Sequence, residues 1–158
     1  MPIDQDEFRN ALSRFASGVT VVTTKDAAGK FHGITVSAFS SVSLDPPLIL
    51  ICIERATVSH YAFEESGLFV VNFLSDRQLE LSERFASPVE DKFDGVDFSF
   101  GEFGIPILLG SLVNLECRIR NIGDGGDHTI FIADVESATI NDGDPLLYFR
   151  SDYRQMAE

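Results

Sequence analysis

Runs of β-branched and other apolar residues, each of strand length, recur along most of this chain and are joined by turn sequences. The runs cover residues 19–24, 31–44, 48–53, 68–73, 111–121, 129–140 and 146–149. The connections at 26–29, 123–127 and 141–145 are rich in Gly, Asp and Pro, which is typical of turns. Strands joined by turns pair antiparallel, and many short strands in 158 residues favour a small closed barrel. The regular strand–helix alternation of a doubly wound fold is absent.

Few helices are predicted, and all of them are short. The segment 4–7 resembles a capping box, and the apolar stripe that follows it (Phe8, Ala11, Leu12 and Phe15) predicts a helix that Gly18 ends. A second short helix is expected within 57–67, and a third after a capping box at 75–78. Residues 86–110 contain scattered Gly and Pro and are predicted to form a loop.

The composition excludes several classes of function. The net charge of −13 argues against nucleic acid or an anionic membrane as a partner, and the longest uncharged apolar run, near 46–53, is too short to span a bilayer. Cys52 and Cys117 lie in apolar runs without CxxC spacing, which favours buried reduced thiols over a disulfide. Because the acidic start is also unlike a secretory signal peptide, we expect a cytoplasmic protein in which residues 1–158 form a single domain.

The run 33–44 alternates in a way that predicts a strand with two different faces. One face is mostly apolar, and the other carries small hydroxyl groups (Thr35, Ser37, Ser41 and Ser43) with no charged residue before Asp45. Two interpretations fit the run equally well. The hydroxyl face lies in solvent, or it binds a flat, polar organic ligand through neutral donors and acceptors. Ser40 falls on the apolar face and joins the hydroxyls only if the strand bends near Phe39.

The segment 55–60 has the composition of a phosphate site at the start of a helix. Free N–H groups at a helix start attract anions, and Arg55, Thr57 and Ser59 add charged and neutral hydrogen-bond donors. A simpler interpretation is that Thr57 or Ser59 caps a helix that ends at Gly67, with Arg55 in solvent. Taken alone, the segment favours the simpler interpretation.

Two further segments carry candidate ligand-binding side chains. His128 follows Gly126 and Asp127 at the start of a strand, where it can donate a hydrogen bond near neutral pH. Lys92 and Phe93 offer a charge for a phosphate and a ring for stacking. Taken alone, the first segment favours a turn histidine held by Asp127, and the second favours a surface loop. The three histidines form no HxH or HExxH spacing, so no metal site is predicted, and no P-loop, GxSxG or Rossmann glycine motif is present.

Together and in this order, these segments resemble the flavin reductase-like family of small NAD(P)H:flavin oxidoreductases, which supply reduced flavin to two-component monooxygenases. The resemblance covers residues 8–23, 33–48, 69–72, 91–93, 126–132 and 145–150. The segment 33–48 and the Gly-Asp-His segment at this spacing are its most specific parts. Two departures are that Ala133 and Asp134 stand where the family often has Gly, and that 35–38 replaces an Asn/Ser-rich version.

The resemblance implies a mostly β fold, the FMN-binding Greek-key split β-barrel with a few short helices, and a flavin site at a homodimer interface. It implies flavin contacts, with FMN or FAD, from Thr35, Val36, Ser37, Ala38, Ser40 and Ser41 at the ring, from Glu54, Arg55, Thr57, Ser59 and His60 at the ribityl and phosphate groups, and from Lys92 and Phe93 nearby. It places His128 near the nicotinamide of NADH or NADPH, and Tyr153 over the same side.

The function that the resemblance implies is hydride transfer from the nicotinamide to the flavin, with the reduced flavin passing to a partner monooxygenase. The cofactors carry this chemistry, and the protein supplies geometry and charge complementarity. Two alternatives remain: a non-catalytic FMN-binding split-barrel protein, and a pyridoxamine phosphate oxidase-like enzyme. The second alternative calls for a richer phosphate pocket than Arg55 and Lys92 offer.

Overall fold

Three short helices and twelve strands make up residues 1–157, which are the residues that the computed structural model describes. The helices are α1 (Gln5–Leu12), α2 (His60–Ser66) and α3 (Leu79–Phe85). The chain is therefore mostly β with a few short helices, as predicted. Among these residues no helix is both long and apolar enough to cross a membrane.

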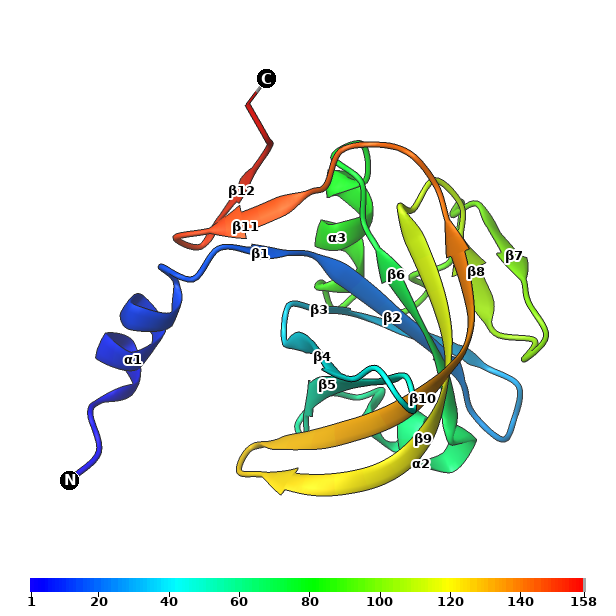
Figure 1. Cartoon of the computed structure of the whole chain (residues 1–158), viewed down its shortest axis with the longest axis horizontal. Helices are drawn as coiled ribbons and strands as arrows, with labels where there is room; N and C mark the ends of the chain where they lie inside the picture. The colour runs from blue at the N-terminus through cyan, green and yellow to red at the C-terminus, as the bar shows by residue number, and fades with distance from the viewer. Residues whose placement is uncertain (158) are drawn as a thin grey trace.

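Seven strands form one antiparallel sheet in the order β3-β2-β6-β9-β10-β5-β4. They are β2 (Thr20–Lys25), β3 (Phe31–Val36), β4 (Phe39–Ser43), β5 (Leu48–Glu54), β6 (Leu68–Phe73), β9 (Val113–Gly125) and β10 (His128–Ile140). The sheet curls strongly, and the long hairpin β9–β10 lies in its middle and extends to a projecting tip (Figure 1). No ladder joins the edge strands β3 and β4 in the described part of the chain, so the closed barrel predicted from the strand pattern is wrong.

Two small sheets flank the large one. The first contains β1 (Ser17–Gly18), β11 (Leu147–Phe149) and β12 (Asp152–Arg154), and the second contains β7 (Phe98–Phe100) and β8 (Pro106–Leu108). The second sheet lies inside the segment 86–110 that was predicted to be a loop. Each of its strands is only three residues long and Gly or Pro lies nearby, so the strands give no periodic signal.

The run 33–44 is two strands rather than the single strand that its alternation predicts. β3 ends at Val36 and β4 begins at Phe39, and these strands form opposite edges of the seven-stranded sheet. Phe39 has the parity of the predicted hydroxyl face, yet its ring packs against Phe73 with centroids 5.0 Å apart. The chain turns a corner at Ser37 and Ala38, which resets the alternation, so the predicted continuous hydroxyl face does not exist.

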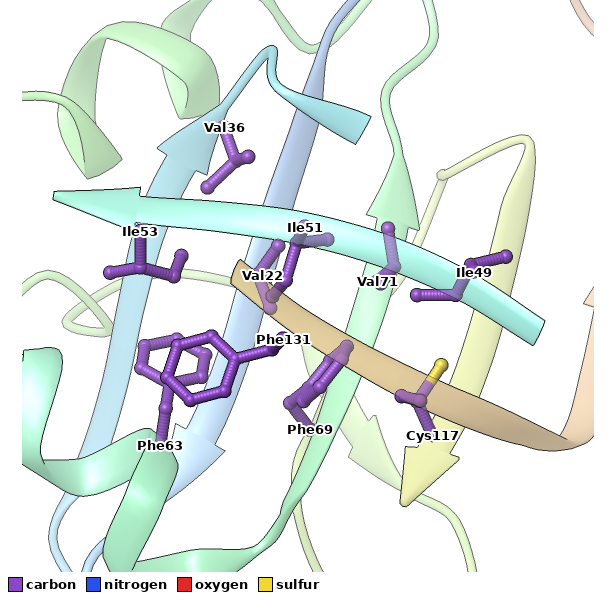
Figure 2. Packing of buried hydrophobic residues seen from close by; sticks show 11 residues of the cluster. Val22, Val36, Ile49, Ile51, Ile53, Phe63, Phe69, Val71, Cys117 and Phe131 are labelled. Carbon is purple, nitrogen blue, oxygen red and sulfur yellow. The ribbon is translucent and has the colours of Figure 1, made fainter. Parts of the chain in front are cut away.

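The main apolar cluster fills the concave side of the curled sheet. Val22, Ile51, Phe69 and Phe131 come from four different strands, and Phe63 of α2 packs on them (Figure 2). All five side chains are almost completely buried. Burial of each such side chain contributes about 1.5–3 kcal/mol, so this cluster holds the sheet in its curled form. Because side chains fill this space, a ligand has to bind at the rim or outside it.

Helix α1 stands clear of the sheet (Figure 1). Asp4 caps it by accepting a hydrogen bond from the Glu7 N–H at 2.8 Å, as the capping-box pattern predicts. The helix ends at Leu12 and not at Gly18, which instead pairs with Leu147 of β11. None of its residues is buried, and Phe8 and Leu12 are each about half exposed, so its apolar face is uncovered in this chain.

Candidate functional site

The predicted phosphate segment and the predicted nicotinamide histidine lie side by side. Antiparallel pairing of β5 with β10 sets His128 opposite Glu54. The Arg55 N–H donates to the carbonyl of Asp127 at 2.9 Å, and the Arg55 guanidinium donates to the carbonyl of Gly126 at 3.1 Å and to Asp124 Oδ1 at 2.7 Å. We call residues 54–60, together with the β9–β10 tip at 123–129, the turn side of the site.

His128 is exposed at the tip and anchored through one ring nitrogen. Its Nδ1 lies 2.7 Å from Asp127 Oδ1, and this hydrogen bond holds the pKa of Asp127 below its usual range. The contact is the one expected for a turn histidine. No hydrogen bond to His128 Nε2 occurs within residues 1–157, and 40% of the side chain is exposed, so the free ring edge can still meet a ligand.

The remaining turn-side residues divide into exposed and buried groups. Glu54 is exposed and Thr57 is half-buried, whereas His60 bonds through Nε2 to the hydroxyl of Thr129 at 2.7 Å. Ser59 is the N-cap residue of α2, yet its side chain makes no cap hydrogen bond because it faces His32 instead. The helix ends at Gly67 with a left-handed backbone, as predicted.

The corner between β3 and β4 presents small residues to the surface. Ser37, Ala38, Ser40 and Ser41 are exposed there, while Val36 is buried in the main apolar cluster. Beside the corner opens a mostly apolar cavity of about 180 Å³. Its lining includes Gly18, Thr20, Ser37, Phe39, Phe73 and Leu146. The corner therefore places exposed hydroxyls next to an apolar recess, a combination that suits a flat ring with one polar and one apolar edge.

A third group of predicted residues packs against α3, and we call it the α3 side. Lys92 Nζ donates to the carbonyls of Phe85 at 2.9 Å and Gly33 at 3.2 Å, and partial burial lowers the pKa of Lys92. The ring of Phe93 lies edge-to-face on Phe85, with centroids 5.1 Å apart. Lys92 and Phe93, which were both predicted to contact the ligand, are thus engaged in contacts within the protein.

Thr35 and Tyr153 also belong to the α3 side, because both bond to Ser82. The Thr35 hydroxyl donates to the Ser82 carbonyl at 2.6 Å, and the hydroxyl groups of Tyr153 and Ser82 lie 2.7 Å apart. Tyr153 was predicted to cover the same side as His128. In Figure 1 its strand β12 and the β9–β10 tip lie far apart, so one copy of the chain does not bring the two residues together.

Two other sequence observations gain a structural explanation. Asp134, where the family often has Gly, forms a bidentate ion pair with Arg120 at 2.9 Å for both bonds. Both cysteines are free thiols, and burial raises the pKa of Cys117 to about 12, which keeps that thiol protonated and unreactive. No cluster of metal-ligating side chains occurs within the described residues.

Sequence reasoning missed one polar group altogether. Asp26 was assigned to a turn and His32 to no role, but the two side chains are buried together beneath the turn side. His32 bonds to Asp26 through one ring nitrogen and to Ser59 through the other. Because Ser59 is distant in sequence, no spacing rule finds this group. The only available signal was the presence of a histidine in a strand-like run.

The chain is thus a curled antiparallel sheet with an exposed arginine turn and an apolar recess at its rim. The family model described as "Flavin reductase like domain" matches residues 12–157. The chain therefore belongs to the flavin reductase-like family, as its motifs indicated.

Relatives with known names span most of the chain. "FMN reductase (NADH) SmoA" of Agrobacterium fabrum is 43% identical over 141 residues, which cover 89% of this chain and 80% of that protein. "Flavin-dependent monooxygenase, reductase subunit HsaB" of Rhodococcus jostii is 40% identical over 152 residues, covering 96% and 77%. A Rhizobium meliloti relative is 41% identical over 150 residues, but the chain spans only about half of it, 48% of its length.

The fold of this chain is also similar to that of a solved structure. The NADH:FAD oxidoreductase SgcE6 of Streptomyces globisporus, in complex with NAD and FAD fragments, superposes with a TM-score of 0.93. It is 36% identical, and the match covers 98% of this chain and 93% of that one.

Proposed function

We propose that this chain is an NAD(P)H-dependent flavin reductase, which transfers a hydride from a nicotinamide to FMN or FAD and supplies reduced flavin to a partner monooxygenase. Family membership and relatives named as FMN reductase and as a monooxygenase reductase subunit support this proposal. The main structural support is the contact between the Arg55 segment and the β9–β10 tip. This contact places the Arg55 guanidinium, which can bind a phosphate, beside His128.

The residues fit a flavin in three respects. The exposed corner at 37–41 offers hydroxyl and backbone groups to the polar edge of the ring, and these groups stabilise the negative charge that gathers there on reduction. The apolar recess beside it has room for the apolar edge. Arg55, with 47% of its side chain exposed, meets the phosphate. The flavin and nicotinamide supply the redox chemistry, so no side chain has to act as a nucleophile.

His128 has a positioning role in this proposal. Asp127 fixes the orientation of the ring through Nδ1, which leaves the Nε2 edge for the nicotinamide nucleotide. Hydride transfer needs the two rings stacked at a defined distance, so a group that orients the nicotinamide raises the rate without exchanging a proton.

The proposed fold class in full is the Greek-key split β-barrel. The two-residue corner between β3 and β4 supports it, because it ties together the two edges of the curled sheet. Residues 1–158 form one domain in this proposal. Strand β2 supports the single domain because it contributes to both apolar clusters of the chain: Val22 belongs to the main cluster and Val21 to a second one. Two free cysteines fit a reducing cytoplasm as its location.

A homodimer is part of the proposal, and α1 is its main support. Phe8, Leu12 and Phe15 are exposed on or just after this helix, and water-exposed apolar groups of this size are normally covered by a partner. A dimer also offers a way to bring Tyr153 of one copy to the nicotinamide side of the other. Light scattering on the purified protein should give twice the 17.4 kDa chain mass, and the chain mass itself would contradict the dimer.

The enzymatic proposal is tested with the purified protein, FMN, FAD or riboflavin, and NADH or NADPH. We expect flavin-dependent loss of nicotinamide absorbance with at least one combination of flavin and nicotinamide nucleotide. Comparison of the combinations gives the flavin preference and the nicotinamide preference. Flavin binding without oxidation for any pair would support the non-catalytic alternative and overturn the reductase assignment.

A further inference from the structure

Four polar side chains link the β2–β3 turn to the start of α2. His32 Nε2 lies 2.9 Å from Asp26 Oδ2, and His32 Nδ1 lies 2.9 Å from the Ser59 hydroxyl. The Tyr61 hydroxyl donates to the same Asp26 oxygen at 2.8 Å. The side chains of His32 and Asp26 are only 5% and 6% exposed. We call Asp26, His32, Ser59 and Tyr61 the buried network.

The charge on Asp26 fixes the direction of the hydrogen bonds that its carboxylate makes. The bonds from His32 and Tyr61 hold the pKa of Asp26 well below its usual range, so its carboxylate is an acceptor. His32 therefore carries a proton on Nε2, which it donates to Asp26, and its Nδ1 lies within hydrogen-bond distance of the Ser59 hydroxyl. The other groups that face the network are the Lys30 N–H, which donates to Asp26 Oδ1, and Glu65, which accepts from the Ala27 N–H.

This arrangement ties the Ser59 hydroxyl to His32. Ser59 is also only 9% exposed. Its side chain therefore acts on the fold of its own turn, and the groups left for an anion on this turn are the Arg55 guanidinium, the Thr57 hydroxyl and backbone N–H groups. The same burial argues against a hydrolytic Ser-His-Asp triad, because no substrate reaches the hydroxyl.

The turn needs such an anchor because it has few hydrogen bonds of its own. The backbone bonds of residues 55–59 run from the N–H groups of Arg55, Thr57, His60 and Ala62 to the carbonyls of Asp127, Glu54, Thr57 and Ser59, respectively. The first ties the turn to the β9–β10 tip, and the other three are local. The link from Ser59 to His32 is the one side-chain bond of the described residues that ties the turn to β3.

We propose that Asp26 and His32 are positioning residues for the flavin phosphate: through Ser59 they hold residues 55–59 in the conformation that presents Arg55. This inference rests on the proposed function. It predicts that the network favours flavins with a phosphate and contributes little to riboflavin, which lacks the group that the turn receives.

The test compares FMN with riboflavin in variants of the network. Asp26→Asn removes the charge that fixes the His32 tautomer and keeps the side-chain size. We expect its KM for FMN to rise about tenfold, its KM for riboflavin to stay within about twofold, and kcat at saturating flavin to change little. Thr23→Val is the control, because it deletes a buried polar group outside the network, a hydroxyl that donates to the Pro106 carbonyl at 2.6 Å. It should lower the melting temperature without raising either KM.

The outcomes separate a positioning role from a structural one. Equal rises in both KM values, or a loss of melting temperature with neither KM changed, would overturn the proposal. If Asp26→Asn does not fold, Tyr61→Phe decides, because it removes one donor to Asp26 and leaves the rest of the network. It should raise the KM for FMN about twofold to threefold and leave that for riboflavin unchanged.

Failure of the proposed function gives a different result. If the wild-type protein oxidises no nicotinamide, the dissociation constants of FMN and riboflavin, measured by quenching of flavin fluorescence, replace the KM values. The same selective loss of FMN affinity would support the network in a non-catalytic protein. A wild-type protein that binds neither flavin would overturn both proposals.

Discussion

The turn side and the α3 side both carry residues typical of flavin and phosphate binding, yet the fold treats them differently. On the turn side, Arg55 and His128 keep 47% and 40% of their side chains exposed. On the α3 side, the Lys92 ammonium already has two backbone carbonyl partners and the Tyr153 hydroxyl is bonded to Ser82. The comparison teaches that residue type alone does not assign a role. What counts is how many donors a side chain has left after folding.

The two cations illustrate the difference in energy. The Arg55–Asp124 pair lies at the surface, where an ion pair contributes about 0–1 kcal/mol, so little free energy is lost when Arg55 leaves Asp124. Lys92 is half-buried and bonded to carbonyls that have no other side-chain donor within residues 1–157. Removing a partner from such groups costs about 1–3 kcal/mol, so Lys92 is expected to stay where it is.

The largest effect is expected from Arg55→Gln, which tests the turn side. The KM for FMN should rise about 10- to 100-fold, because a charge-assisted hydrogen bond contributes about 1.5–3 kcal/mol. Steady-state kinetics at saturating NADH measures it. Arg120→Gln is the control, since Arg120 lies on the hairpin that Arg55 contacts and is held by Asp134. An equal rise in KM in both variants would assign the effect to the hairpin and not to the arginine at the turn.

Lys92→Met should separate the α3 side from the turn side. We expect the free energy of unfolding to fall by about 1–3 kcal/mol, because two carbonyls lose their donor, while the KM for FMN changes less than about threefold. Denaturant unfolding and kinetics on the same sample give both numbers. Lys30→Met, at an exposed position, is the control. If Lys92→Met raises the KM as strongly as Arg55→Gln does, the two sides do not differ in the way described.

His128→Ala tests the other half of the turn side. The KM for NADH should rise about tenfold while the KM for FMN stays within about twofold, because the imidazole edge is expected to meet the nicotinamide nucleotide alone. Asp127→Asn keeps the ring but weakens its anchor, so it should raise the KM for NADH by a smaller factor. If the KM values of His128→Ala equal those of the wild type, His128 is not part of the site.

The smallest effect is expected from Tyr153→Phe. Deleting one hydroxyl partner of Ser82 should lower the free energy of unfolding by about 0.5–1.5 kcal/mol. The double variant with Ser82→Ala should lose less than the sum of the single variants, because both remove the same bond. If Tyr153→Phe instead raises the KM for NADH and leaves stability unchanged, Tyr153 belongs to the ligand site, which then requires the second copy of the chain.

Apolar periodicity predicted the strands well where both faces of a strand are buried. The run 19–24 became Thr20–Lys25 and the run 68–73 became Leu68–Phe73. It failed for 33–44, because alternation reports which side a residue faces and not where the chain leaves one sheet edge for the other. The end of α1 was also wrong, since Gly18 was needed for pairing with β11 rather than for stopping the helix.

The candidate site residues could be proposed from the sequence as types but not as partners. Arg55 and His128 were proposed from their segments and the family resemblance, whereas their adjacency depends on β5 pairing with β10 across a long sequence separation. The occupied state of Lys92 follows from packing against α3, which no local pattern contains. Asp26 and His32 were missed for the same reason, because their role follows from contacts made by the folded chain.

An anaerobic reaction of the wild-type protein with FMN and NADH tests the central claim most directly. Without oxygen the reduced flavin accumulates, so the visible absorbance of oxidised FMN should disappear as NADH is consumed, one flavin for each nicotinamide. Arg55→Gln should slow this loss at low FMN and match the wild type at saturating FMN, whereas Lys92→Met should follow the wild type at both. Loss of FMN absorbance at the protein-free rate would contradict the assignment of this chain as a flavin reductase.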